Sequence, residues 1–194
     1  MRVLLASNSP RRRELLRSLV PEFDVEAFPA DERFSGKTPE ETVSEIARRK
    51  LVAAKERFSD YDLVIAADTL VYMDGKYYGK PVDASDAKRM LKELSGKTHT
   101  VYSGLAVMKS GAFLYATEAT DVSFKKLSEE EIDGYLKSNS VLDKAGAYAV
   151  QDGVVVKGYK GSYTNIVGLP IEKLSALTGL PSELPEAPPD IEKY

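Results

Sequence analysis

The sequence predicts a mixed α/β fold in which helices pack on a β-sheet. Short apolar runs of strand length alternate irregularly with segments whose apolar residues recur at helical spacing, so the chain does not consist of regular βα repeats. The most strand-like run, Leu63–Ala67, is apolar at every position, which is typical of a strand covered on both faces. At 194 residues the chain is long enough to bury a large core.

The N-terminal segment predicts a strand, a tight turn and a helix. Val3–Ala6 has strand length, Ser7–Pro10 breaks the run, and Arg11–Leu19 shows helical spacing. Ser9 fits the N-cap, and Pro10 fits the first helical turn because its missing N–H has no partner to lose there. The free backbone N–H groups and the helix dipole both favour negative charge, so this turn is a candidate anion site.

Three consecutive arginines, Arg11–Arg13, occupy the first turn of this helix. Cations are unfavourable at this end because they face the positive pole of the helix dipole. The arrangement fits a polyanion bound over the turn, and the alternative is a solvated basic helix end.

The next segment predicts a second strand and a long helix. Phe23–Phe28 alternates like a strand and is followed by two acids, Asp31 and Glu32, for which a solvated loop is the alternative interpretation. Thr38–Glu41 forms a capping box that starts a helix reaching to about Arg57. Its inward face consists of Val43, Ile46, Ala47, Leu51 and Ala54. Lys50 lies beside this apolar stripe rather than opposite it, so its tip can reach a cleft, and a solvated basic face is the alternative.

The apolar run Leu63–Ala67 predicts the central strand, and we expect it to stop at Asp68 and Thr69. An acid at the carboxyl end of a central strand is where α/β proteins place catalytic groups. Leu70–Tyr72 then continues as a strand, and Asp74–Gly75 predicts a hairpin turn.

The remaining elements follow from caps, turns and periodicity. After a loop at Gly79–Pro81, we expect a helix at Ala84–Ser95 capped by Asp83 and Gly96, and then strands at Thr98–Met108 and Phe113–Phe124 around a hairpin loop. A helix opened by the capping box Ser128–Glu131, a small-residue loop at Asp143–Tyr148 and a strand at Val154–Val156 follow. The chain is expected to end with a glycine-rich loop at Gly158–Gly168, a helix at Ile171–Leu177 capped by Gly179, and a loosely held proline-rich tail at Pro181–Tyr194.

Composition excludes several classes of function. The net charge of −3 does not suggest DNA or RNA binding, and no apolar run approaches the ~20 residues of a membrane span. The chain has no Cys and one His, which excludes a thiol nucleophile and a His-rich metal site. We interpret that residue, His99, as a structural hydrogen-bonding group. The N-terminal sequence has no signal-peptide pattern, so a cytoplasmic location is expected.

Charged side chains at strand ends, helix starts and loops fall into two chemical groups. The anion binders are Ser7, Arg11, Arg12, Lys50 and Lys80, and the acids are Glu32, Asp68 and Asp143. Cations that hold phosphates, together with carboxylates that hold Mg²⁺ or Mn²⁺ and orient a water, are the composition of a phosphoryl-transfer site. Composition does not show that these residues meet, and solvated faces are the alternative.

Several ordered motifs resemble the Maf family of nucleoside triphosphate pyrophosphatases across about residues 3 to 178. They are Ser7–Arg12, Asp31–Glu32, Lys50 after Ala47–Arg49, Ala67–Thr69, Gly79–Pro81, Gly96–His99 with Val101–Gly104, and Asp143–Tyr148 with Gln151. The resemblance implies an elongated mixed sheet with two lobes and a central cleft, similar to the inosine triphosphatase fold. It places one catalytic domain at residues 1–180 and the tail at 181–194.

The resemblance also implies chemistry. The family hydrolyses a nucleoside triphosphate to the monophosphate and pyrophosphate. Asp68 matches the proton acceptor, and further active-site positions match Glu32, Lys50 and Lys80. A divalent cation, Mg²⁺ or Mn²⁺, would bind Glu32 and Asp68, and Ser7 and Arg12 would bind substrate phosphate.

Base-selecting positions match the subgroup that acts on dTTP and UTP, and that also removes modified pyrimidine nucleotides. This subgroup carries Arg, Thr and Gln where the chain has Arg11, Thr69 and Gln151. A subgroup acting on 7-methyl-GTP differs at the first two positions. The family is also tied to septum formation, so a nucleotide-binding regulator of cell division, acting through a protein partner, is the alternative function. The resemblance is compatible with a homodimer.

Overall fold

The computed structural model describes residues 1–34, 38–181 and 183–194, and it contains two compact units. The first comprises residues 1–69, 102–119 and 164–185, and the second comprises residues 70–101, 120–163 and 186–194. The strands hydrogen-bond in the order β2 (Asp24–Val25), β1 (Val3–Leu5), β3 (Leu63–Met73), β5 (Thr98–Lys109), β6 (Ala112–Phe124), β7 (Val156–Lys160) and β8 (Glu192–Lys193), and β4 (Lys76–Tyr78) pairs with β3. Parallel and antiparallel pairs both occur, which confirms the predicted mixed α/β fold.

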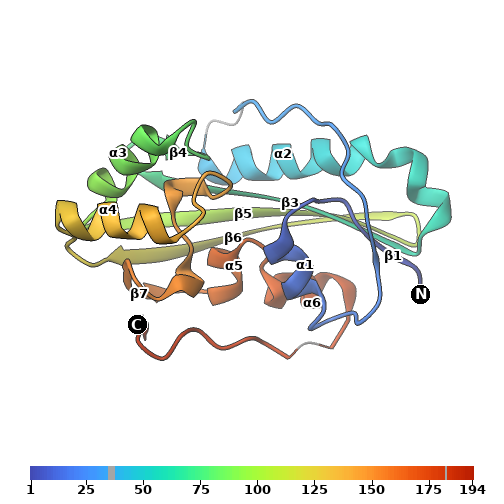
Figure 1. Cartoon of the computed structure of the whole chain (residues 1–194). Coiled ribbons are helices and arrows are strands. Elements are labelled where there is room, and N and C mark those ends of the chain that lie inside the picture. The colour runs from blue at the N-terminus through green and yellow to red at the C-terminus, as the bar shows by residue number, and fades with distance from the viewer. Residues whose placement is uncertain (35–37, 182) are drawn as a thin grey trace. The chain divides into compact units, whose positions relative to one another are not determined.

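The first unit contains the helices that the sequence predicts after Ser9 and after Thr38 (Figure 1). Its elements, some of which continue into the second unit, are β1 (Val3–Leu5), α1 (Pro10–Leu16), β2 (Asp24–Val25), α2 (Pro39–Ala53), a 3₁₀ helix (Lys55–Asp60), β3 (Leu63–Met73), β5 (Thr98–Lys109), β6 (Ala112–Phe124), α5 (Tyr163–Val167) and α6 (Ile171–Thr178).

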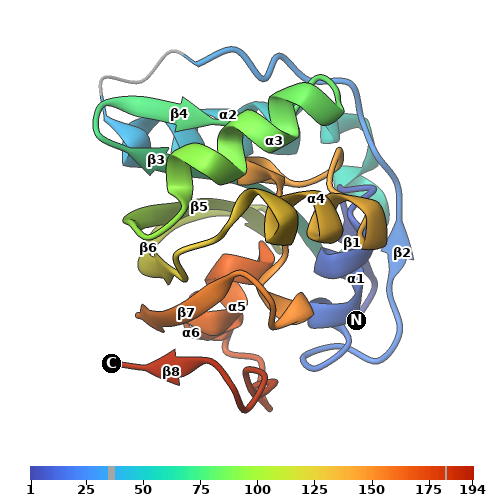
Figure 2. The ribbon, with the colours of Figure 1, turned by 60° about the vertical axis from the view of Figure 1, so that its left-hand side comes forward.

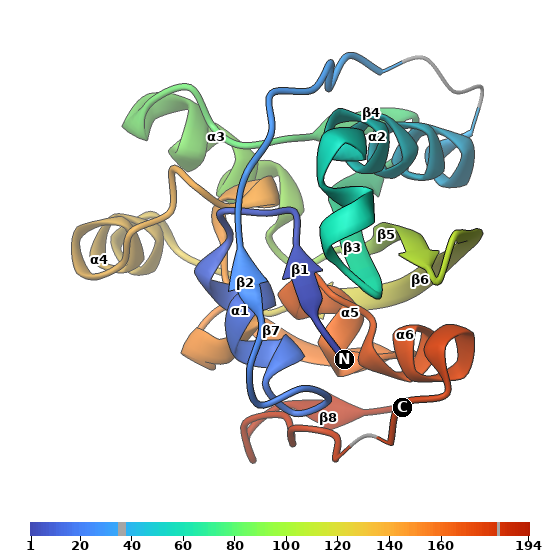
Figure 3. The same cartoon turned by 90° about the vertical axis from the view of Figure 1, so that its right-hand side faces the viewer.

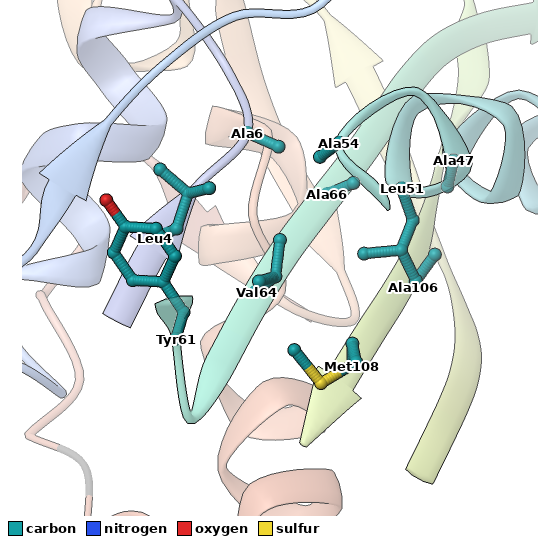
Figure 4. Close-up of a cluster of buried hydrophobic side chains, with 10 residues drawn as sticks. All are labelled: Leu4, Ala6, Ala47, Leu51, Ala54, Tyr61, Val64, Ala66, Ala106 and Met108. Atoms are coloured by element: carbon teal, nitrogen blue, oxygen red, sulfur yellow. The ribbon is translucent and has the colours of Figure 1, made fainter. Parts of the chain in front are cut away.

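Helices cover both faces of the strands in this unit. α2 lies on one face, while α1, α5 and α6 lie on the other (Figure 1). On the α2 side, Leu51 and Ala47 pack with Val64 and Ala66 of β3 in a buried cluster that also contains Met108 (Figure 4). The predicted inward face of α2 is confirmed, because all five of its members are buried.

Two elements are shorter than the sequence predicts. α1 ends at Leu16 rather than Leu19, because the next three N–H groups bond to carbonyls three residues back and tighten the chain into a 3₁₀ turn. β2 covers only Asp24–Val25, because it pairs with the short β1 through Leu4 and Leu5 (Figure 3).

The helix that begins at Pro39 also ends early, at Ala53, and the chain continues as the 3₁₀ helix Lys55–Asp60. The last turn of the predicted helix, which was expected to reach Arg57, is therefore wound more tightly. Ala54, which the sequence places on the inward face, keeps its buried position at the junction.

The central strand does not stop where the sequence predicts. β3 runs without interruption from Leu63 to Met73, so Asp68 lies within the strand and not at its carboxyl end. What ends here is the neighbouring strand, because β1 accompanies β3 only as far as the Leu5–Ile65 pair. Asp68 and Thr69 therefore lie beside the loop that follows β1 and not beside a paired strand residue of β1, although their own strand continues.

The close approach of α2 to β5 depends on Gly104. A Cβ atom built on this glycine would lie 2.3 Å from the backbone oxygen of Val43 in α2. Because that neighbour is helix backbone, it cannot rotate away.

We expect Gly104→Ala to lower the free energy of unfolding by about 2–3 kcal/mol, because the helix must move off the strand to admit the methyl group. Thermal unfolding should show a melting temperature lower by about 5–10 °C. Gly134→Ala is the matched control, since nothing lies within 4 Å of its Cβ position. An unchanged melting temperature for Gly104→Ala would contradict the close approach.

The second unit confirms the local signals of the sequence. Its own elements are β4 (Lys76–Tyr78), α3 (Ala84–Leu94), α4 (Glu129–Ser138), short 3₁₀ helices (Ala145–Ala147 and Val150–Asp152), β7 (Val156–Lys160) and β8 (Glu192–Lys193). Asp83 caps α3, and Ser128 forms the predicted capping box with Glu131. The hairpin turn between β3 and β4 uses positive φ at Asp74 and Gly75.

The C-terminal third differs most from the prediction. The strand β7 begins at Val156 and includes Gly158, so the predicted strand at Val154–Val156 is two residues early. The segment expected to be a glycine-rich loop contains the rest of β7 and helix α5.

The expectation of a loosely held tail is wrong for its last residues, while Ser182 lies outside the described residues. β8 pairs in parallel with β7 (Figure 2), and Ile191 beside it is buried. Gly158 makes this pairing possible, since a Cβ atom there would lie 2.7 Å from Glu192 O and from the ring of Tyr194. Among the residues that the structure describes, no helix is both long and apolar enough to cross a membrane.

Candidate active site

The site forms where β1 ends beside β3. Successive side chains of a strand point to opposite faces, so Asp68 shares the α2 face with Ala66, whereas Thr69 points to the face that carries α1. The loop that follows β1 brings Ser7 to the same place. Each face therefore supplies its own cluster of polar groups.

On the α2 face, one ammonium group joins two carboxylates. Lys50 Nζ lies 2.7 Å from Asp68 Oδ1 and 3.0 Å from Glu32 Oε1. Lys50 can reach them because it lies beside the apolar stripe of α2, as its spacing predicts. The side chain of Asp68 is 10% exposed and that of Glu32 is 56% exposed, so the cluster extends from the interior to the surface.

This cluster leaves groups available for a substrate. Among the described residues, Asp68 has one carboxylate oxygen bonded to Lys50 and its other oxygen makes no hydrogen bond. Lys50 donates one hydrogen bond to Asp68 and forms an ion pair with Glu32, and an ammonium group has three N–H donors in all. A carboxylate oxygen that can accept a proton thus lies beside a cation that can hold a phosphate oxygen.

On the opposite face, three acceptors fix the guanidinium of Arg12. Its Nε donates to Gly168 O at 2.8 Å, Nη1 donates to Ser7 Oγ at 3.3 Å, and Nη2 donates to Thr69 Oγ1 at 3.2 Å. Ser9 caps the helix that carries Arg12, as predicted, by accepting from the backbone N–H of Arg12. An arginine has five N–H donors, so two have no partner in the part of the chain that the structure describes, one on each terminal nitrogen.

Electrostatics connect the two clusters. The pKa of Arg12 is lowered from its ordinary value, chiefly by burial. The carboxylates of Asp68 and Glu32 act in the opposite direction, and the charge of Arg11 lowers the pKa further. Arginine stays protonated in proteins, so Arg12 offers a partly desolvated positive charge. A phosphate group bound here would compensate for the burial.

The acids fit a metal ion that also needs phosphate ligands. No group of three or more His, Asp and Glu residues that could hold a metal occurs in the described ranges. Mg²⁺ is commonly held by one or two carboxylates plus substrate phosphates, and Glu32 and Asp68 are two carboxylates that already share one cationic group. Their oxygen donors suit a hard cation.

Other predicted site residues are placed as follows. Arg11 is half-buried on α1, and the guanidinium that contacts Thr69 is that of Arg12. Lys80 and Gln151 lie in the second unit, and both are exposed. Asp143, also in the second unit, forms an ion pair with Lys144. The structure thus assembles six of the predicted residues in the first unit, namely Ser7, Arg12, Thr69, Glu32, Lys50 and Asp68.

Two residues of the site were not predicted. Ser103 is fully buried on β5, and its hydroxyl lies 2.8 Å from Thr69 Oγ1. Gly168 supplies the carbonyl that accepts from Arg12, and its φ of 121° suits only glycine. Ser103 lies in the family motif Val101–Gly104, and Gly168 ends the glycine-rich segment that begins at Gly158, but neither signal indicates a hydrogen-bond partner.

His99 in the second unit has the environment of a structural residue. Its Nε2 lies 2.8 Å from Tyr148 OH, and its ring packs edge-on against Phe124 and Tyr148. Burial lowers the pKa of His99 to about 3, so the ring is neutral at neutral pH. These contacts support the structural interpretation.

Comparison with known proteins identifies the family. The family model described as "Maf-like protein" matches residues 2–179. Proteins named dTTP/UTP pyrophosphatase are similar along most of their length. The relative from Pyrococcus abyssi is 40% identical over 182 residues, which are 92% of this chain and 95% of the relative. The relative from Thermotoga maritima is 44% identical over 174 residues, which are 88% and 85% of the two chains.

Solved structures show a weaker similarity. A HAM1 protein from Coxiella burnetii is 14% identical and covers 92% of this chain and 91% of its own, with a TM-score of 0.46. That similarity is too low to carry an argument, and the assignment depends on the family model and the relatives. The family that the sequence motifs suggested is therefore confirmed, and the chain belongs to the Maf family.

Proposed function

We propose that the chain is a nucleoside triphosphate pyrophosphatase that hydrolyses dTTP and UTP to the monophosphate and pyrophosphate. The observation that carries the proposal is the Lys50 ammonium between Asp68 and Glu32, within electrostatic reach of Arg12. The names of the relatives supply the substrate class.

The charged residues clustered in the first unit have distinct roles in this reaction. Asp68 accepts the proton of the attacking water on its unbonded oxygen, while Lys50 holds the other oxygen in place. Arg12 and the ammonium group of Lys50 bind the phosphate chain. A Mg²⁺ or Mn²⁺ ion held by Glu32, Asp68 and the phosphates would supply charge neutralisation when bound.

Base recognition is proposed from the family subgroup. Gln151 can donate to and accept from the edge of a uracil-type ring, and Arg11 and Thr69 belong to the same set. Lys80 is proposed as a further active-site cation, and modified pyrimidine nucleotides as further substrates. A catalytic role is favoured over that of a nucleotide-binding regulator, because a binder has no need of a largely buried acid with an unbonded oxygen.

The test is pyrophosphate release from UTP, dTTP, CTP and GTP by the purified chain. We expect kcat/KM for UTP and dTTP to exceed that for CTP and GTP. If no nucleotide of this panel releases pyrophosphate, the proposal is wrong.

Substituting Gln151 by Ala should change the choice of base. A base edge left without its hydrogen bond costs ~1–3 kcal/mol, so the ratio of kcat/KM for UTP to that for GTP should fall by roughly tenfold or more. Arg12→Gln is the contrasting variant, because phosphate carries no base information and all four nucleotides should be affected about equally. If Gln151→Ala lowers all four by the same factor, Gln151 does not select the base.

A further inference from the structure

The hydroxyl of Ser103 is a buried group that the proposed reaction does not use. Ser103 is fully buried, and its Oγ lies 2.8 Å from Thr69 Oγ1 and 3.5 Å from the carbonyl oxygen of Asn165. It makes no hydrogen bond to Arg12 itself, so any effect on Arg12 passes through Thr69.

The hydrogen-bonding capacity of the Thr69 hydroxyl indicates how Ser103 acts on its orientation. A hydroxyl has one hydrogen and two lone pairs, and Arg12 Nη2 takes one lone pair. The remaining hydrogen and lone pair serve Ser103 Oγ at 2.8 Å and Gly168 O at 3.3 Å. Ser103 makes the shortest of the three contacts, so it contributes most to fixing the orientation of Thr69.

The orientation of Thr69 in turn limits the orientation of Arg12. Gly168 O holds the Nε side of the guanidinium, while Thr69 and Ser7 each hold one terminal nitrogen. The two N–H groups that have no partner among residues 1–34, 38–181 and 183–194 are on those same terminal nitrogens, so a rotation of Thr69 would redirect one of them. Bidentate recognition of phosphate depends on the direction of this fork.

We propose that Ser103 is a positioning residue that fixes Thr69 and thereby aims the free N–H groups of Arg12 at the phosphate chain of the substrate. The identity of that substrate rests on the proposed function, whereas the placement of Arg12 for a polyphosphate does not. Thr69 then acts on phosphate binding through Arg12, besides the role in base selection that the family subgroup suggests.

A double-mutant cycle tests the proposal with inorganic tripolyphosphate as probe. Calorimetry would measure its dissociation constant for the unmodified chain, Ser103→Ala, Arg12→Lys and the double variant. Arg12→Lys keeps the charge, so binding stays measurable, but it removes the guanidinium fork. We expect Ser103→Ala to weaken binding ~10-fold in the unmodified chain and less than about 2-fold beside Arg12→Lys, because interacting residues are not additive.

Controls separate positioning from a loss of structure. Thr178→Val removes another buried hydroxyl of the same unit, one that bonds to Leu174 O within α6, and it should leave binding unchanged. Melting temperatures of all variants would show that they fold. In the UTP, dTTP, CTP and GTP panel, Ser103→Ala should lower kcat/KM for all four nucleotides, because each carries the same triphosphate chain.

The outcomes distinguish this inference from the proposed function. An equal effect of Ser103→Ala with Arg12 and with Arg12→Lys would overturn the inference, as would no effect at all or an unmodified chain that does not bind tripolyphosphate. A chain that binds the probe with the expected coupling, but releases no pyrophosphate from any nucleotide, would support the inference and overturn the proposed function.

Discussion

Asp68→Asn should lower kcat for UTP by about 10²–10⁴-fold, the range typical of losing a general base. The amide has the shape of the carboxylate but cannot accept the proton of the attacking water. Lys50 keeps its contact with Glu32, and the phosphate-binding groups are unchanged, so KM should change little. Steady-state kinetics with UTP would measure both parameters.

A matched control for Asp68→Asn is available just before the same strand. Asp62 is exposed and accepts a hydrogen bond from the backbone N–H of Arg2, so Asp62→Asn should leave kcat unchanged. Near-normal turnover by Asp68→Asn would contradict the assignment and would move the base role to Glu32 or elsewhere.

Excess chelator should abolish pyrophosphate release, with a fall of at least about 10³-fold, and either Mg²⁺ or Mn²⁺ should restore it. Lys50 and Arg12 provide two positive charges, and Lys50 is already shared between Glu32 and Asp68. A triphosphate therefore brings more negative charge than the cations of the first-unit clusters neutralise. The assay would follow pyrophosphate release against added metal.

The control for this experiment is chelator already saturated with Mg²⁺, which should not inhibit. Full activity in excess free chelator would contradict the metal-assisted reaction. The arginine and lysine side chains would then account for phosphate neutralisation without a divalent cation.

Local signals explain why much of the fold could be predicted. The caps Asp83 and Ser128, the hairpin at Asp74–Gly75 and the stripe of α2 each depend on residues a few positions apart. β8 could not be found this way, because it depends on the room that Gly158 leaves more than thirty residues earlier. Long-range pairing is not expressed in local spacing.

The site shows the same division. Lys50 could be predicted from its place beside an apolar stripe. Asp68 was predicted from the end of its own strand, and the structure corrects that reason, because the neighbouring strand ends here and its own does not. Ser103 and Gly168 were missed because their partners lie 34 and 99 residues from them in the sequence. The roles of Lys80 and Gln151 stay predictions.

Identifying which bond of UTP is cleaved tests the central claim most directly. Phosphorus NMR would follow UTP with the unmodified chain and with Asp68→Asn in parallel, in the presence of Mg²⁺. The account predicts that the unmodified chain forms UMP and pyrophosphate in equal amounts, and that Asp68→Asn forms them at least about 10²-fold more slowly. Formation of UDP and orthophosphate, or equal rates for the two proteins, would contradict it.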